Sequence, residues 1–166
     1  MTRLRNIVVL IGLAAALAGA GLTIRAKEQI LADGRTVLLE LAPVDPRSLI
    51  QGDYMALRYA PKLQPEASGE ALPGTGAAVL VLDERGLAAF RRLDGGEPLG
   101  PDEVRLRYRS LLPDGDVRYG ADSYFFEEGR AEAYQVARYG VLKVDAAGNS
   151  VLIGLADAEG RMIRPE

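Results

Sequence analysis

The feature that most constrains this chain is an uncharged, apolar run near its amino terminus. Residues 7–24 read IVVLIGLAAALAGAGLTI, with Arg3 and Arg5 before them and Arg25 and Lys27 after them. At about 1.5 Å per residue, a helix of this run is roughly 27 Å long, close to the ~30 Å hydrocarbon core of a bilayer. The sequence therefore predicts a membrane-spanning helix, with the rest of the chain outside the bilayer.

Two interpretations of this run remain open. A basic start, an apolar stretch and the small residues Ala18, Gly19 and Ala20 are also typical of a secretory signal peptide that is cleaved. A retained anchor is favoured because the run is longer than the apolar part of most signal peptides. In both cases the C-terminal part is exported. We expect a single-pass protein of a bacterial inner membrane with a periplasmic C-terminal domain.

This expectation divides the chain into four parts. Residues 1–6 are a cytoplasmic tail, and residues 7–24 are the transmembrane anchor in contact with the lipid bilayer. Residues 25–35 are a juxtamembrane helix or linker, in which the helix ends at a glycine, Gly34. Residues 36–166 are an exported β-rich domain.

Short apolar runs separated by turn signals dominate the exported part. In VRLRYRSLL, Val104, Leu106 and Tyr108 alternate with three arginines, which indicates a strand with one buried and one solvated face. One short soluble helix is expected over residues 128–137. The pattern predicts a mainly β fold, either an antiparallel barrel-like domain or a sandwich.

The composition excludes several classes of function. The chain has no cysteine, histidine or tryptophan, which removes thiolate nucleophiles, histidine-based triads and most zinc or haem sites. We therefore expect no metal and no cofactor. The net charge is −3 and the basic residues are dispersed, so no nucleic-acid partner is expected. The arginine stripe at 105, 107 and 109 is predicted to be a solvated strand face and is one candidate surface for a partner.

The segment LIQGDYMALRY carries the most distinctive motif. Its glycine and aspartate suit a turn, after which Met55, Leu57 and Tyr59 are expected on one strand face and Tyr54 on the other. A single pocket is therefore not expected to contain Tyr54, Leu57 and Tyr59 together. A second aromatic and acidic stretch, YGADSYFFEEGRAEAY, follows later in the chain.

These two stretches resemble the GDYXXLXY family of bacterial membrane-anchored proteins. The first motif consists of Gly52, Asp53, Tyr54, Leu57 and Tyr59, and the second signature includes Tyr124, Phe125, Glu128 and Gly129. The resemblance implies an N-terminal anchor, an exported β-rich domain and frequent association in the genome with a polytopic membrane protein. We expect such a polytopic inner-membrane protein to be the partner. It favours a non-catalytic binding or accessory module.

An enzymatic alternative remains open. RSLIQGDYMALRY is also similar to the serine-box segment of signal-peptidase-like proteases, which implies a hydrolase with Ser48 as nucleophile. Lys143 would then be the general base. In VLKVDA, however, alternation places Lys143 on the face opposite Leu142 and Val144, so we expect it to point to solvent.

Overall fold

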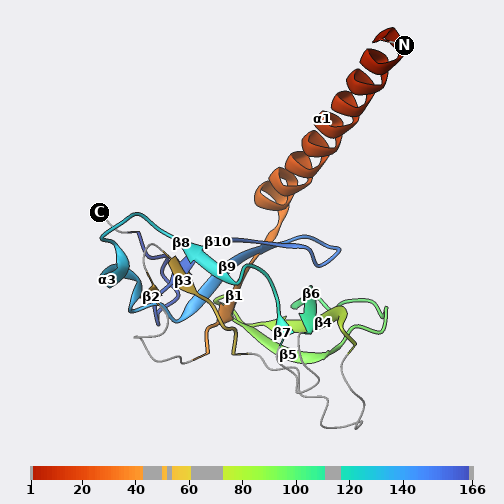
Figure 1. Cartoon of the computed structure of the whole chain (residues 1–166). Coiled ribbons are helices and arrows are strands. Elements are labelled where there is room, and N and C mark those ends of the chain that lie inside the picture. Colours follow the sequence, from red (N-terminus) through yellow and green to blue (C-terminus); the bar gives the residue numbers. More distant parts are fainter. Residues whose placement is uncertain (1, 43–49, 52–53, 61–72, 111–116, 165–166) are drawn as a thin grey trace.

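A computed structural model of the chain describes residues 2–42, 50–51, 54–60, 73–110 and 117–164 (Figure 1). Ser48, Gly52 and Asp53 lie outside these residues. The elements are, in chain order, α1 (Thr2–Asp33), β1 (Arg35–Glu40), β2 (Ile50–Gln51), β3 (Tyr54–Ala56), β4 (Thr75–Leu82), β5 (Ala88–Leu93), β6 (Glu103–Ser110), β7 (Val117–Arg118), β8 (Ser123–Phe125), α3 (Ala131–Tyr134), β9 (Tyr139–Val144) and β10 (Ser150–Ala156).

Helix α1 runs without interruption through the predicted anchor and the juxtamembrane segment. Between Arg5 and Asp33 its most apolar window has a mean hydropathy of 2.5, and none of that window is buried against the protein. Its length and composition allow it to cross a membrane, and an anchor and a signal sequence share these properties. Within the described ranges it is the one helix of this kind.

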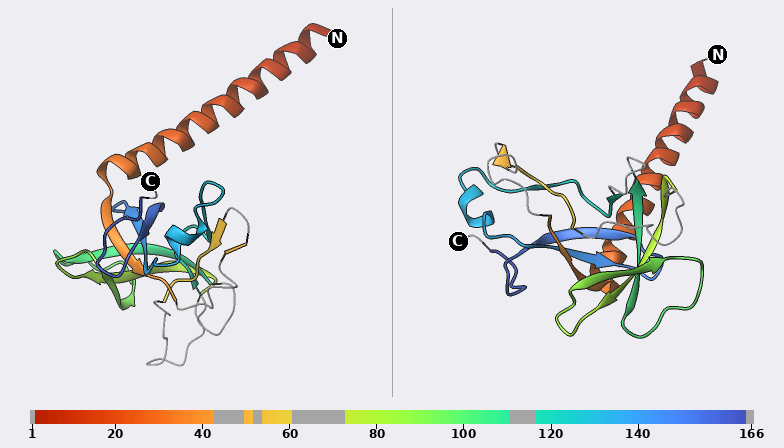
Figure 2. Two further views of the ribbon diagram at one scale, coloured as in Figure 1. Left: turned by 90° about the vertical axis from the view of Figure 1, so that its left-hand side faces the viewer. Right: turned by 90° about the horizontal axis from the view of Figure 1, so that it is seen from below.

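The C-terminal end of α1 packs against strands β9 and β10 (Figure 1 and Figure 2). Ile30 is buried there, with 5% of its surface exposed. Gly34 ends the helix as predicted: its amide donates to the Ile30 carbonyl at 2.9 Å, and a Cβ at this position would lie 2.3 Å from that oxygen. The Lys143 ammonium donates to the Gly34 carbonyl at 3.0 Å. These contacts of Ile30, Gly34 and Lys143 hold the C-terminal end of α1 against the domain, and we name them the joint.

The described strands form three antiparallel sheets. Their hydrogen-bonded orders are β1-β9-β10, β2-β3-β8 and β5-β4-β6-β7. Consecutive strands form hairpins at β4–β5 and at β9–β10. The sheets do not close into a barrel.

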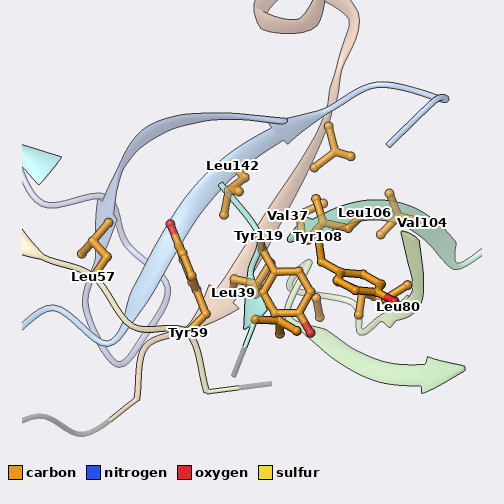
Figure 3. Packing of buried hydrophobic residues seen from close by; sticks show 14 of the residues in the cluster. Val37, Leu39, Leu57, Tyr59, Leu80, Val104, Leu106, Tyr108, Tyr119 and Leu142 are labelled. Atoms are coloured by element: carbon orange, nitrogen blue, oxygen red, sulfur yellow. The ribbon is translucent and has the colours of Figure 1, made fainter. Parts of the chain in front are cut away.

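The main core lies between the first and third of these sheets (Figure 3). Val37, Leu39 and Leu142 enter it from one side, and Leu80 and Leu106 enter it from the other, all fully buried. In β6 the buried residues alternate with the arginines as the sequence predicts. Such alternation between core-facing and solvent-facing residues is typical of packed antiparallel sheets.

Backbone hydrogen bonds also join the sheets at their edges. The amide of Leu38 donates to the Gly86 carbonyl at 2.8 Å, and the amide of Arg107 donates to the Gly148 carbonyl at 2.9 Å. Leu41 forms a bridge with Tyr59, which links the end of β1 to the segment after β3. The three sheets are thus held in one arrangement.

The expected mainly β fold with an N-terminal apolar helix and one short soluble helix is confirmed. Of the two arrangements considered, the barrel-like one is wrong, because the sheets stay open. The soluble helix is also shorter than residues 128–137, since α3 has a single turn. Gly129 has φ +82°, a left-handed conformation that an α-helix cannot contain, so the helix begins only after it.

Candidate functional site

The two sequence signatures lie side by side in one sheet. β3 carries the GDYxxLxY motif, and it pairs with β8, which carries the aromatic residues of the second signature. Tyr54 is opposite Phe125, and Met55 is opposite Tyr124. The chain continues this contact beyond β3, because the Leu57 amide donates to the Asp122 carbonyl at 2.8 Å. The structure therefore brings the two stretches together, although they are far apart in the sequence.

The inner face of the motif belongs to the core. Met55, Leu57 and Tyr59 are all buried, as the alternation predicts. The Tyr59 hydroxyl donates to the Ala121 carbonyl at 3.0 Å, and its ring makes an edge-to-face contact with Tyr119 at a centroid distance of 6.3 Å (Figure 3). This hydrogen bond and this ring contact attach Tyr59, which follows β3, to the segment that follows β7.

Burial controls the ionisation of these inner tyrosines. Desolvation raises the pKa of Tyr59 well above its ordinary value, and the negative charge of Asp122 adds to the effect. Desolvation also raises the pKa of Tyr119, with a further contribution from Tyr108. Both phenols stay protonated at neutral pH. They suit hydrogen bonding in the core better than proton transfer to a substrate.

The outer face of the same strand pair carries two aromatic rings, of which Phe125 is exposed and Tyr54 is half-buried. Tyr54 and Phe125 are 5.7 Å apart between ring centroids, and their planes are tilted by 39°. Phe125 has 73% of its surface exposed, the highest value among the exposed large apolar side chains of the described residues. We name this Tyr54 and Phe125 surface the aromatic pair. Apolar side chains that adjoin one another on a surface can mark a contact site, so the aromatic pair is a candidate binding surface.

The remaining aromatic residues of the second signature pack inward. Tyr134 of α3 stacks on Phe126 at 5.0 Å and makes an edge contact with Tyr124 at 5.3 Å. Burial and the hydrogen bond with Tyr124 raise the pKa of Tyr134 to about 12. α3 thus covers the inner side of β8 with aromatic side chains.

Glu128 and Gly129 of the second signature lie in the turn that precedes α3. Both are exposed, and a Cβ at Gly129 would meet nothing within 4 Å. The glycine is therefore required by its positive φ and not by a close neighbour. Arg130, the residue that follows, lies 3.9 Å from the carboxylate of Glu127. The turn presents its acidic side chains to solvent.

Lys143 does not point freely into solvent as the strand pattern suggested. It is half-buried, and its ammonium is bound to the carbonyl that follows α1. A cation at the C-terminal end of a helix also opposes the partial negative charge there. Ser48 lies outside the described residues. The hydrolase that combines Ser48 with Lys143 therefore stays a hypothesis, while Lys143 has a structural contact of its own.

A second surface feature is a groove of about 930 Å³ along β6 and β7. Its charged lining residues are Asp94, Arg105, Arg107, Arg109, Arg118 and Asp122. The arginine stripe is thus one wall of a hollow surface, which the sequence did not predict. Within the residues that the structure describes, no group of acidic side chains has the arrangement needed to hold a metal ion.

Comparison with protein families agrees with the motifs. The family described as GDYXXLXY protein matches residues 16–155, which is most of the chain. The chain belongs to the GDYXXLXY family. No curated protein and no solved structure matches it. The match begins inside α1 and ends in β10, so it includes the second half of the helix, the joint and nearly the whole β-rich domain.

The residues of this family motif have two different roles in the structure. Leu57 and Tyr59 are core residues, and Tyr54 belongs to the aromatic pair. Sequence reasoning anticipated the opposite faces of the strand. It missed Phe125 as the partner of Tyr54, because only the strand pairing brings them together. A run of two consecutive phenylalanines after Tyr124 was the one available signal, since two adjacent strand residues cannot both face the core.

Proposed function

We propose that this protein is a membrane-anchored, non-catalytic accessory module that docks on a polytopic inner-membrane protein through the aromatic pair. Residues 7–24 cross the bilayer, and the β-rich domain beyond residue 35 lies in the periplasm. The observation that carries the proposal is Phe125, an exposed ring at the place where both family signatures meet. Aromatic side chains are enriched in the buried centres of protein interfaces.

The joint between α1 and the domain supports this role. Residues 25–33 extend the helix by roughly 14 Å past the apolar run, at about 1.5 Å per residue. The domain contacts this extension, since the Lys27 ammonium donates to the Ser150 carbonyl at 3.5 Å. Ile30 and the Lys143 contact fix the helix to β9 and β10. A domain held in this way is confined near the membrane surface, which raises its effective concentration for a membrane partner.

Single-cysteine labelling tests the topology. Because the chain has no cysteine, Glu159→Cys and Thr2→Cys each provide one thiol, at an exposed turn of the domain and at the start of α1. In intact spheroplasts an impermeant maleimide should label the Glu159→Cys variant and not the Thr2→Cys variant. The reverse pattern would overturn the periplasmic assignment. Release of the domain from the membrane fraction, with loss of its first residues, would show a cleaved signal peptide instead of an anchor.

Affinity purification tests the docking. From detergent-solubilised membranes, the tagged wild-type protein should recover one integral membrane protein, and Phe125→Ser should lose it. Leu93→Ser is the matched control, because Leu93 is also an exposed apolar strand residue but lies on β5, away from the aromatic pair. Equal recovery by the Phe125→Ser variant, or equal loss by the Leu93→Ser variant, would contradict docking through the aromatic pair.

A further inference from the structure

The outer face of β6 is electrostatically uneven from one end to the other. At its beginning, Glu103 contacts the guanidinium groups of Arg91 at 3.0 Å and Arg92 at 3.4 Å. Next along the strand, Arg105 is paired with Asp94 at 2.5 Å. The positive charges of this half are therefore balanced by carboxylates close to them.

The other half of the same face carries an excess of positive charge. Arg107 and Arg109 are exposed, and among the residues that the structure describes neither forms an ion pair. Arg109 lies directly opposite Arg118 of β7, which is paired with Asp122. Among the described residues of this half, Asp122 is the carboxylate that accompanies the three arginines, and it contacts Arg118. Two like charges on directly opposite strand positions destabilise the folded protein.

This positive half is also hollow. The neighbouring strand contributes Thr75 and Ala77, which lie opposite Arg109 and Arg107 and are too small to fill the space beside them. Gly120 and Ala147 line other parts of the groove, whose volume is about 930 Å³. The arginine side chains thus border a space that a ligand can enter.

We propose that this groove binds an acidic peptide segment, with carboxylates at alternate positions, that belongs to the partner protein. Two arginines at alternate strand positions are about 7 Å apart at their Cα atoms, which is also the spacing of alternate side chains in an extended peptide. Guanidinium groups bind carboxylates through paired, charge-assisted hydrogen bonds. Three arginines on two paired strands match several carboxylates better than the single phosphate of a simple lipid headgroup.

The site is distinct from the aromatic pair but deepens the same function, because the acidic segment is assigned to the docking partner. The aromatic pair lies on β3 and β8, whereas the groove lies along β6 and β7. Its test needs no partner protein. Failure of the acidic-segment assignment is therefore distinguishable from failure of docking through Phe125.

The experiment measures binding of a fluorescent peptide to the full-length protein in a neutral detergent. The probe has glutamate at alternate positions, and a second peptide has the same composition with its glutamates consecutive. We compare wild type with Arg107→Gln/Arg109→Gln. The matched control is Arg85→Gln/Arg161→Gln, which removes the same charge from two exposed arginines outside the groove.

The groove variant should weaken binding of the alternating peptide by about tenfold or more, a change of roughly 1.4 kcal/mol, while the control variant stays near wild type. The alternating peptide should also bind more tightly than the consecutive one. Equal weakening by both double variants would overturn the proposal, since net charge alone would then explain the binding. Stronger binding to vesicles that contain phosphatidylglycerol, dependent on Arg107 and Arg109, would overturn it in favour of a lipid headgroup.

Discussion

The two faces of β3 differ in what they contact. On the inner face, Leu57 and Tyr59 are buried in the main core, and the Tyr59 hydroxyl has a backbone partner. On the outer face, Tyr54 contacts Phe125, whose ring is largely exposed. Packing in the core therefore explains Leu57 and Tyr59, whereas Tyr54 makes its aromatic contact at the surface. The comparison teaches that a family motif can combine residues that maintain the fold with residues available for binding.

High pH should have the largest effect, and it should act on the inner face. The pKa values of Tyr59, Tyr119 and Tyr134 are raised by burial, the last to about 12. The unfolded chain releases these protons near pH 10, so the stabilisation is complete below about pH 10 and is lost as the pH rises toward 12. We expect circular dichroism to show unfolding of the strands in this range, together with tyrosinate absorbance. Ionisation of all seven tyrosines near pH 10 without loss of structure would contradict the buried inner face.

Removing the Tyr59 ring should have the next largest effect. Tyr59→Ala empties space in the core and should lower the free energy of unfolding by about 3–5 kcal/mol. Tyr59→Phe keeps the ring but leaves the Ala121 carbonyl without its donor, which should cost about 1 kcal/mol. Urea denaturation of the detergent-solubilised protein measures both values. Similar losses for the two variants would show that the hydrogen bond, and not the packed ring, carries the contribution of Tyr59.

Changes to the outer face should have the smallest effect on stability. Tyr54→Ser and Phe125→Ser remove a cross-strand aromatic contact, which is typically worth about 0.2–1 kcal/mol. Each variant should therefore unfold within about 1 kcal/mol of wild type under the same urea conditions. A loss near that of Tyr59→Ala would place Tyr54 and Phe125 among the structural residues and end the distinction between the two faces.

The features that the sequence predicted correctly are those with a local period. The apolar run predicted α1, Gly34 predicted its end, and alternation predicted which side chains of β6 and of the motif strand are buried. Each of these depends on neighbouring residues along the chain, so a short window of sequence contains the information. The helix predicted over residues 128–137 shows the limit: the positive φ of Gly129 delays its start, and α3 ends already at Tyr134.

The features that escaped prediction depend on contacts between distant segments. The pairing of Tyr54 with Phe125 requires the register of β3 with β8. The position of Lys143 depends on the end of α1, which the pattern of its own strand does not contain. The juxtaposition of Arg109 and Arg118 likewise follows from strand register. The candidate binding surfaces were therefore less predictable than the elements that carry them.

Site-specific photo-crosslinking in intact cells tests the central claim most directly. A photoreactive phenylalanine analogue at position 125 samples the aromatic pair, and the same analogue at Leu93 samples an exposed apolar position on β5. The account predicts a discrete adduct with one integral membrane protein at position 125 and none at position 93. The absence of an adduct at 125, or the same adducts at both positions, would contradict docking through the outer face of the motif.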